Sequence, residues 1–267
     1  MLVRIAFLAT FALLFLTEPT EAGKFQPQEF NSQQYRAQEY MSPTWPALLR
    51  SMIRFGAIDM TSDSNLLDEY AQATECELYE AFYPNDFKWQ QVRRALKESI
   101  QKNVATFPVA FYHTSKAQLG RYDFDQQLFR FTKKTTLKGV NAIYLYAVSG
   151  LGCGVSETKY LPRSFRAVLT SILYLEGLPL SESDARELIA RMDAEGNKDR
   201  IIYVRFNVHI VYIEPYMKIE DKTDATIVRY GQPNSHVAKE VRLDARLDSI
   251  IFYEDKKMTK PIYTYAP

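Results

Sequence analysis

Three polar side chains interrupt an otherwise apolar candidate strand at residues 201–214. Because side chains alternate between the two faces of a strand, Arg205, Asn207 and His209 share one face. If that face lines a groove, they offer a ligand a cation, an amide and a titratable ring. If it meets solvent, they are ordinary surface residues, as is common on half-exposed antiparallel strands. These three residues are therefore candidate ligand-binding residues, and both interpretations stay open.

The chain has two cysteines, Cys76 and Cys153. In an oxidising compartment, an even pair of cysteines is first interpreted as a disulfide. Cys76 lies in a candidate helix over residues 65–82, on the side opposite its apolar stripe, so its thiol is placed to reach another segment. Cys153 lies in a glycine-rich loop, residues 149–154, that is flexible enough to meet it. We therefore expect a disulfide between Cys76 and Cys153.

A catalytic Cys153 is the alternative to this disulfide. As a nucleophile it would need a histidine and an orienting acid brought to it in space, and His113 and His209 both lie on candidate strands. A disulfide with Cys76 would consume the Cys153 thiol that catalysis requires. The glycines around Cys153 do not indicate a nucleotide site, because the residues that follow offer no helix to bind phosphate.

The sequence contains no metal-ligand pattern. Its histidines lack the spacing of a metal-binding pair, and its cysteines lack zinc spacing. Two oxygen-rich segments, residues 59–65 and 193–199, are better explained as a helix start and an acidic turn. The first lacks the glycine and glutamate of a calcium loop. We expect no metal and no cofactor.

The first 22 residues have the layout of a secretory signal peptide. A short basic start is followed by an apolar run, residues 5–16, and small residues at Thr20 and Ala22 fit a cut after Ala22. The apolar run is too short to span a bilayer, and no later stretch is apolar over that length. We expect a secreted or periplasmic protein with no transmembrane segment in the mature chain.

The bulk composition is that of a globular protein with a net charge near zero. Of 267 residues, 46% are hydrophobic, and 33 basic side chains balance 32 acidic ones to a formal charge of +1. A nucleic-acid partner is therefore not indicated. Residues 23–44 are polar and rich in glutamine, and are expected to form a flexible leader.

Helical spacing of apolar residues predicts three helices within residues 45–106. The first follows Thr44 and ends at Gly56, the second covers residues 65–82, and the third begins at Asn85 or Asp86. The second has its apolar stripe at Leu66, Leu67, Tyr70, Thr74, Leu78 and Ala81. A further helix is predicted between Ser181 and Gly196, where Ser181 and Asp184 resemble a capping box.

From residue 107 onward the apolar period changes to two, which indicates strands. The candidate strands are residues 107–113, 119–124, 128–132, 142–148, 165–175, 201–214, 225–230, 237–253 and 261–265. The clearest is residues 241–253, where one face is apolar and the other begins Arg242, Asp244, Arg246, Asp248. We interpret this charged ladder as solvated surface.

Helices first and strands later predict an α+β fold. A helical section, residues 45–106, is expected to pack on a mainly antiparallel β-sandwich or partly open barrel, residues 107–267, with one inserted helix. The two sections are expected to form one cooperative body.

Several motifs resemble secreted bacterial proteins known only as domains of unknown function. They are Asp59, the run Leu66-Leu67-Asp68-Glu69-Tyr70-Ala71, Cys76, the run Asp86-Phe87-Lys88-Trp89, and Tyr122-Asp123-Phe124. The resemblance covers much of residues 59–132. It implies an exported or envelope setting and no particular activity.

Together these observations favour an exported, non-catalytic binding or envelope-associated protein, with an unknown small ligand or protein as partner. The alternatives are a secreted hydrolase or thiol enzyme that uses Cys153 with a histidine, and a structural component of an exported assembly.

Overall fold

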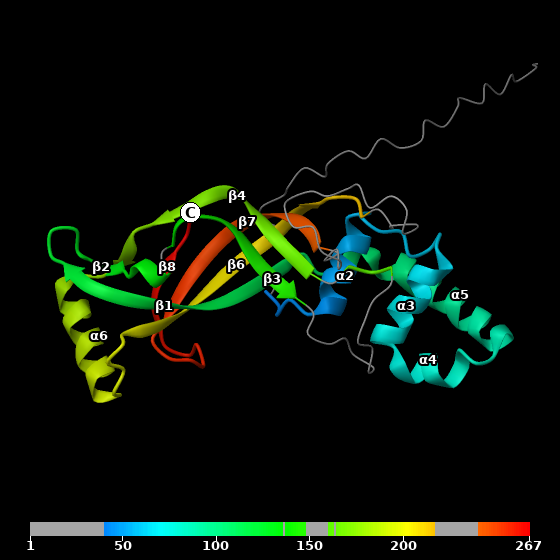
Figure 1. Cartoon of the computed structure of the whole chain (residues 1–267), viewed down its shortest axis with the longest axis horizontal. Coiled ribbons are helices and arrows are strands. Elements are labelled where there is room, and N and C mark those ends of the chain that lie inside the picture. Colours follow the sequence, from blue (N-terminus) through cyan, green and yellow to red (C-terminus); the bar gives the residue numbers. More distant parts are fainter. Residues whose placement is uncertain (1–39, 136, 148–159, 163, 217–239) are drawn as a thin grey trace, which may run out of the picture. The chain divides into compact units, whose positions relative to one another are not determined.

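The computed structural model describes residues 40–135, 137–147, 160–162, 164–216 and 240–267. Within this part of the chain, helices come first and strands follow, with one more helix between strands. Figure 1 shows this order in colour, from blue and cyan helices to the red last strand. The predicted α+β class is confirmed.

Most of the helices begin and end where local chemistry predicts. They are α2 (Trp45–Arg54), α3 (Ser64–Thr74), α4 (Cys76–Phe82) and α5 (Asp86–Asn103), followed by the 3-10 turn η1 (Val104–Thr106). Gly56, just beyond α2, has φ 66°, a conformation that glycine adopts readily. Asp63 and Asn85 cap α3 and α5 by accepting hydrogen bonds from first-turn backbone N–H groups. The helices predicted after Thr44 and from Asn85 are confirmed.

The single helix predicted over residues 65–82 is wrong, because the structure divides it into α3 and α4. Glu75 separates the two helices with φ −129° and ψ 55°, outside helical geometry. The Thr74 hydroxyl donates to the Tyr70 carbonyl at the end of α3, a local bond that competes with regular helix geometry. As a result the predicted apolar stripe does not continue, and Leu78 on α4 is 39% exposed.

Eight strands form one mixed, nearly closed, barrel-like sheet in the described residues. They are β1 (Ala110–Asp123), β2 (Leu128–Phe131), β3 (Leu137–Ala147), β4 (Ser164–Leu175), β5 (Gly177–Pro179), β6 (Ile201–Ile213), β7 (Glu240–Tyr253) and β8 (Pro261–Tyr265). The order is β3-β4-β7-β6-β1-β2-β5, and β8 pairs with β7. Only the β4–β7 pair is parallel among these strands. Of the two architectures expected, the barrel is therefore the one found.

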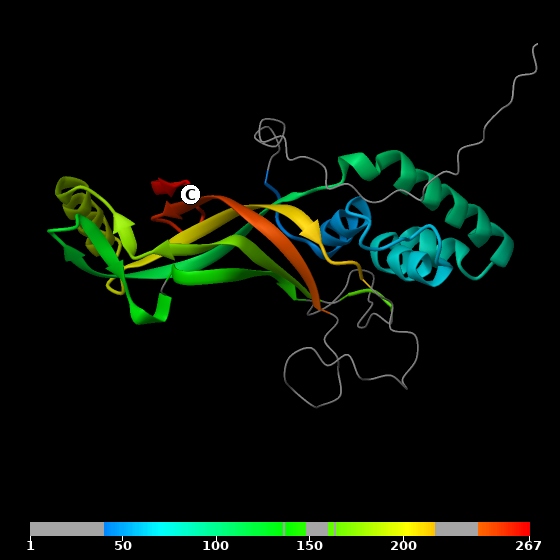
Figure 2. The same ribbon diagram turned by 90° about the horizontal axis from the view of Figure 1, so that it is seen from above.

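Figure 2 shows the long strands β6 and β7 running side by side through this sheet. β1 is one continuous strand where two were predicted, because its polar middle, including Thr114 and Lys116, pairs with β6 without a break. The short strand β5 was not predicted. The candidate strand at residues 225–230 lies outside the described residues.

The inserted helix is confirmed as α6 (Glu182–Ala194). Ser181 caps it, accepting a hydrogen bond from Asp184 N at 3.2 Å, and Gly196 follows with φ 74°. Among the described helices, none combines the length and hydrophobicity needed to cross a bilayer.

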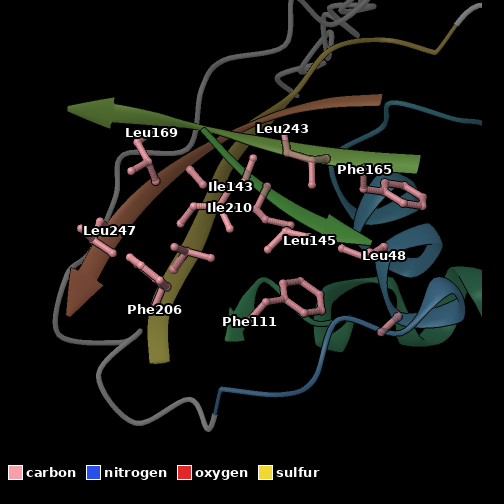
Figure 3. Close-up of a cluster of buried hydrophobic side chains, with 14 of the residues drawn as sticks. Leu48, Phe111, Ile143, Leu145, Phe165, Leu169, Phe206, Ile210, Leu243 and Leu247 are labelled. Atoms are coloured by element: carbon pink, nitrogen blue, oxygen red, sulfur yellow. The ribbon is translucent and has the colours of Figure 1, made fainter. Parts of the chain in front are cut away.

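The core joins the inward sheet face to the first helices. Figure 3 shows Phe111, Phe165, Phe206 and Leu243 from four strands gathered with Leu48 from α2. These side chains are almost fully excluded from water. Burial on this scale is the main stabilising contribution to the fold.

Specific hydrogen bonds also tie the helical section to the sheet section. Trp45 Nε1 donates to Pro162 O at 2.9 Å, and Ser51 Oγ donates to Pro108 O at 2.8 Å. Glu69 accepts from Tyr160 N and Leu161 N at 2.7 and 2.9 Å. The described residues, from Tyr40 onward, accordingly belong to one compact unit.

Gly177 has no room for a side chain. A Cβ there would lie 2.2 Å from Phe129 O, a backbone atom of the neighbouring strand. We expect Gly177→Ala to lower the free energy of unfolding by about 1–3 kcal/mol, since β2 and β5 must separate to admit the methyl group. Urea denaturation measures this loss. Gly120→Ala, whose Cβ would lie 3.1 Å from Arg130 O, should cost less, and equal losses would contradict the argument.

Candidate functional site

The structure places Arg205, Asn207 and His209 on one face of β6, as their alternation requires. Asn207 is 4% exposed and His209 is 1% exposed, while Arg205 is half-buried. Arg205 Nε donates to Asn207 Oδ1 at 3.0 Å, and Asn207 Nδ2 donates to Ser249 Oγ on β7 at 2.9 Å. The three residues therefore belong to a hydrogen-bond network that crosses two strands. Their role in ligand binding stays a prediction.

A bulge in β7 brings an acid to this network. Asn207 pairs with Ser249 and Val208 pairs with Leu247, so Asp248 is an extra residue in the ladder. Asp248 accepts hydrogen bonds from Tyr40 OH at 2.9 Å and from Arg246 Nε at 2.7 Å, and it pairs with His209 Nδ1. The interpretation of Arg246 and Asp248 as solvated surface is therefore wrong.

The same bulge changes which β7 residues face the core. Ile250 and Phe252 are fully buried, whereas Ile251, predicted on the apolar face, is half-buried on the network face. A second irregularity lies in the β6–β7 ladder between Ile210 and Tyr212, and Tyr212 is 41% exposed.

Charge in the network centres on Asp248. Burial raises the pKa of this carboxyl, but hydrogen bonds from His209, Arg246 and Tyr40 outweigh burial, and the pKa is lowered overall. Burial, reinforced by the Asp248 charge, raises the pKa of Tyr40. Tyr40 is therefore a neutral donor and Asp248 a charged acceptor at neutral pH.

The network holds the chain segment at residues 40–41 against the sheet. Met41 N donates to Ala110 O at 3.2 Å, and Tyr112 N donates to Met41 O at 3.0 Å, so Met41 adds a short parallel bridge to β1. The Arg205 guanidinium lies 4.1 Å from the centroid of the Tyr112 ring. The bridge between Met41 and β1 is thus held on both of its strands. Tyr40 is bonded to Asp248 on one side, and Tyr112 packs against Arg205 on the other.

Met41 also lines a pocket of about 510 Å³ at the junction of the helices and β1. Small-molecule sites in proteins commonly measure about 300–1,000 Å³. The pocket is lined by residues of α2, α3, α5 and the start of β1: Met41, Arg50, Tyr70, Glu75, Leu96, Ser99, Ile100, Asn103, Thr106, Phe107, Pro108 and Ala110. Its walls combine apolar surface with a few polar groups, as ligand pockets do.

The charged groups of this pocket are Arg50 on α2 and Glu75, the residue between α3 and α4. Arg50 Nε on α2 donates to the Tyr70 hydroxyl on α3 at 3.2 Å, which orients the guanidinium. That hydrogen bond raises the pKa of Arg50, and the nearby Glu75 carboxylate raises it further. The pocket therefore offers a ligand a permanent cation beside a carboxylate. The sequence did not indicate these residues, because no spacing pattern relates positions on separate helices.

A second pocket of about 570 Å³ lies between α6 and the β1–β2 end of the sheet. Tyr122, Phe124 and Ile189 supply apolar surface, and Phe124 is 68% exposed. Arg186 in its wall pairs with Glu182.

The residues of the enzyme alternative are only partly described. Cys76 begins α4, whereas Cys153 lies outside the described residues, so the disulfide and the catalytic thiol both stay predictions. His113 lies on β1, where its ring centroid is 6.2 Å from that of Phe206, and burial lowers its pKa. Within the described part of the chain, no group of three or more His, Cys, Asp or Glu side chains is arranged to hold a metal ion.

Part of the chain is similar to one protein family. Residues 62–190 match the model of a domain of unknown function, DUF4852. This is consistent with the resemblance seen in the sequence, and it assigns no activity. No curated protein and no solved structure matches the chain.

Proposed function

We propose that this chain is an exported, non-catalytic binding protein that holds a small polar ligand in the pocket at Arg50. The observation that carries the proposal is the pocket itself, of about 510 Å³, with Arg50 and Glu75 in its wall. The signal-like first 22 residues support export.

The Arg50 guanidinium determines which ligand group is recognised. Its Nε is already bonded to Tyr70, so its remaining N–H groups are directed to other acceptors. Carboxylate and phosphate are the acceptors that a guanidinium binds best, because two parallel hydrogen bonds can form. The ligand therefore carries one such anionic group, and Glu75 can accept from an amine or hydroxyl on the same molecule.

The network at Asp248 serves this pocket by positioning its wall. Tyr40 is bonded to Asp248, and Met41, the next residue, both pairs with β1 and lines the pocket. In this proposal the network affects ligand binding indirectly. Its side chains Arg205, Asn207 and His209 hold Tyr40 and Tyr112, which flank Met41 in the pocket wall.

The substitution Arg50→Gln tests the proposal. The protein purified from the exported fraction is analysed by native mass spectrometry, and its bound small molecule is identified and titrated back. We expect Arg50→Gln to weaken binding about tenfold to a hundredfold, because a charge-assisted hydrogen bond is lost. Arg242→Gln, on the exposed pair Arg242–Asp244, is the matched control and should bind as the wild type does. Equal affinity of the two variants, or no small molecule retained, would contradict the proposal.

One observation favours a thiol enzyme as the second candidate function. His209 Nδ1 pairs with Asp248, as an orienting carboxylate holds a catalytic histidine. In this alternative His209 would activate Cys153. Alkylation without reductant separates the candidates, since a readily modified Cys153 whose loss abolishes turnover would overturn the binding proposal.

A further inference from the structure

The helices α4 and α5 and the turn between them carry aromatic side chains that the pocket at Arg50 does not use. Tyr79 and Tyr83 are stacked with ring centroids 4.2 Å apart and planes at 20°. Both rings pack edge-on against Trp89, each with a centroid distance of 5.4 Å. Phe87, beside them, is 86% exposed, and Tyr83 is 43% exposed.

The base of this aromatic cluster is held rigidly. Trp89 is buried, and its Nε1 donates to Asp68 Oδ1 at 2.9 Å. Arg93 Nε donates to the same oxygen at 2.7 Å. The hydrogen bond to Asp68 holds Trp89, a residue of α5, against α3. Trp89 in turn fixes the two tyrosines that pack on it.

The aromatic cluster borders a pocket of about 610 Å³. Its lining residues are Tyr83, Asp86, Phe87, Trp89, Gln90, Gln91, Arg93 and Arg94. Gln90 and Gln91 each carry an amide that both donates and accepts, Asp86 accepts, and Arg94 donates. The wall of this pocket therefore combines aromatic rings for stacking with amide and charged groups for hydrogen bonding.

We propose that this pocket binds a sugar ring of a glycan. One face of a pyranose presents C–H groups, which pack on the electron-rich face of an exposed ring such as Phe87 or Tyr83. The hydroxyls of the sugar both donate and accept, which matches the amides of Gln90 and Gln91. A nucleic acid fits less well, because Asp86 lies in the wall and the chain has a formal charge of only +1.

Tyr79 stays neutral in the aromatic stack at neutral pH. Burial, together with a hydrogen bond to Tyr83, raises the pKa of Tyr79. The Tyr79 phenol therefore keeps its hydroxyl proton over the physiological range.

The proposal is tested on the full mature chain with three defined probes: the N-acetylglucosamine trimer, cellotriose and maltotriose. Saturation-transfer NMR detects contact, and a titration gives the affinity. We expect at least one trisaccharide to bind with a dissociation constant of about 1 mM or lower. Phe87→Ala should weaken that binding about tenfold, because a stacking contact is removed.

The controls separate this site from the pocket at Arg50 and from loss of folding. Phe124→Ala removes another exposed phenylalanine, beside α6, and should leave sugar binding unchanged. Arg50→Gln should also leave it unchanged, so failure of one site is distinguishable from failure of the other. Gln90→Ala should weaken binding with an unaltered melting temperature. Binding of none of the three sugars, or equal binding by wild type and Phe87→Ala, would overturn the proposal.

Discussion

Replacing Asp248 with alanine is expected to lower the free energy of unfolding by about 2–4 kcal/mol. The substitution removes the acceptor that Tyr40, His209 and Arg246 share. Removing one partner of a buried charged network is costly, because the groups that remain lose a bond while still desolvated. The side chain of Asp248 is 15% exposed, so the effect is smaller than for a fully buried pair. Urea denaturation at neutral pH measures it.

The matched control for Asp248→Ala lies on the same strand. Asp244 forms an exposed pair with Arg242 at 3.2 Å, and Asp244→Ala should cost no more than about 1 kcal/mol. Asp248→Asn keeps the size of the side chain and should give an intermediate loss. If Asp248→Ala and Asp244→Ala cost the same, the network does not stabilise the fold.

The stabilisation by Asp248 should depend on pH. Its pKa is lowered in the folded protein, so the folded state favours the carboxylate. The stabilisation is present above the unfolded-state pKa of about 3.9 and is lost as the pH falls through the lower folded-state value. The stability difference between the wild type and Asp248→Asn should therefore be smaller at about pH 3 than near neutral pH. An unchanged difference would contradict the charged role of Asp248.

Strand alternation predicted the face of β6 correctly but could not predict its surroundings. Arg205, Asn207 and His209 share a face because the side-chain period of a strand is two. The partner Asp248 reaches that face only through an extra residue in β7, and a bulge leaves no mark in the period of a single strand. Tyr40 comes from a distant part of the chain that no local pattern relates to β6.

Local signals likewise predicted where most helices begin and end. Asp63 and Asn85 are caps that act within one turn, so they are readable from neighbouring residues. The break at Glu75 was missed, because the apolar residues on either side keep helical spacing although the helices do not continue. The pocket at Arg50 depends on how three helices pack, which spacing along the chain does not encode.

The predicted disulfide has the largest expected effect on stability. The natively exported protein should contain no free thiol by mass, and digestion without reductant should yield a linked peptide containing Cys76 and Cys153. Reduction should lower the free energy of unfolding by up to about 4–5 kcal/mol, because a long loop in the unfolded chain is released; native-state strain reduces this figure. Two thiols that alkylate without reductant, once the chain is unfolded, would contradict the prediction.

The position of Cys76 indicates which part of the fold should respond to reduction. Cys76 is the first residue of α4, and none of the seven residues of this helix is buried. A helix without buried residues gains little from the core, so a covalent link at its start would add substantially to the packing of Tyr79 on Trp89. Reduction should therefore raise amide hydrogen exchange in α4 more than in α2, which has seven buried residues. The variant carrying both Cys76→Ser and Cys153→Ser should exchange like the reduced wild type and be insensitive to reductant. If α4 exchanges equally in both redox states, the two cysteines are not linked in the folded protein.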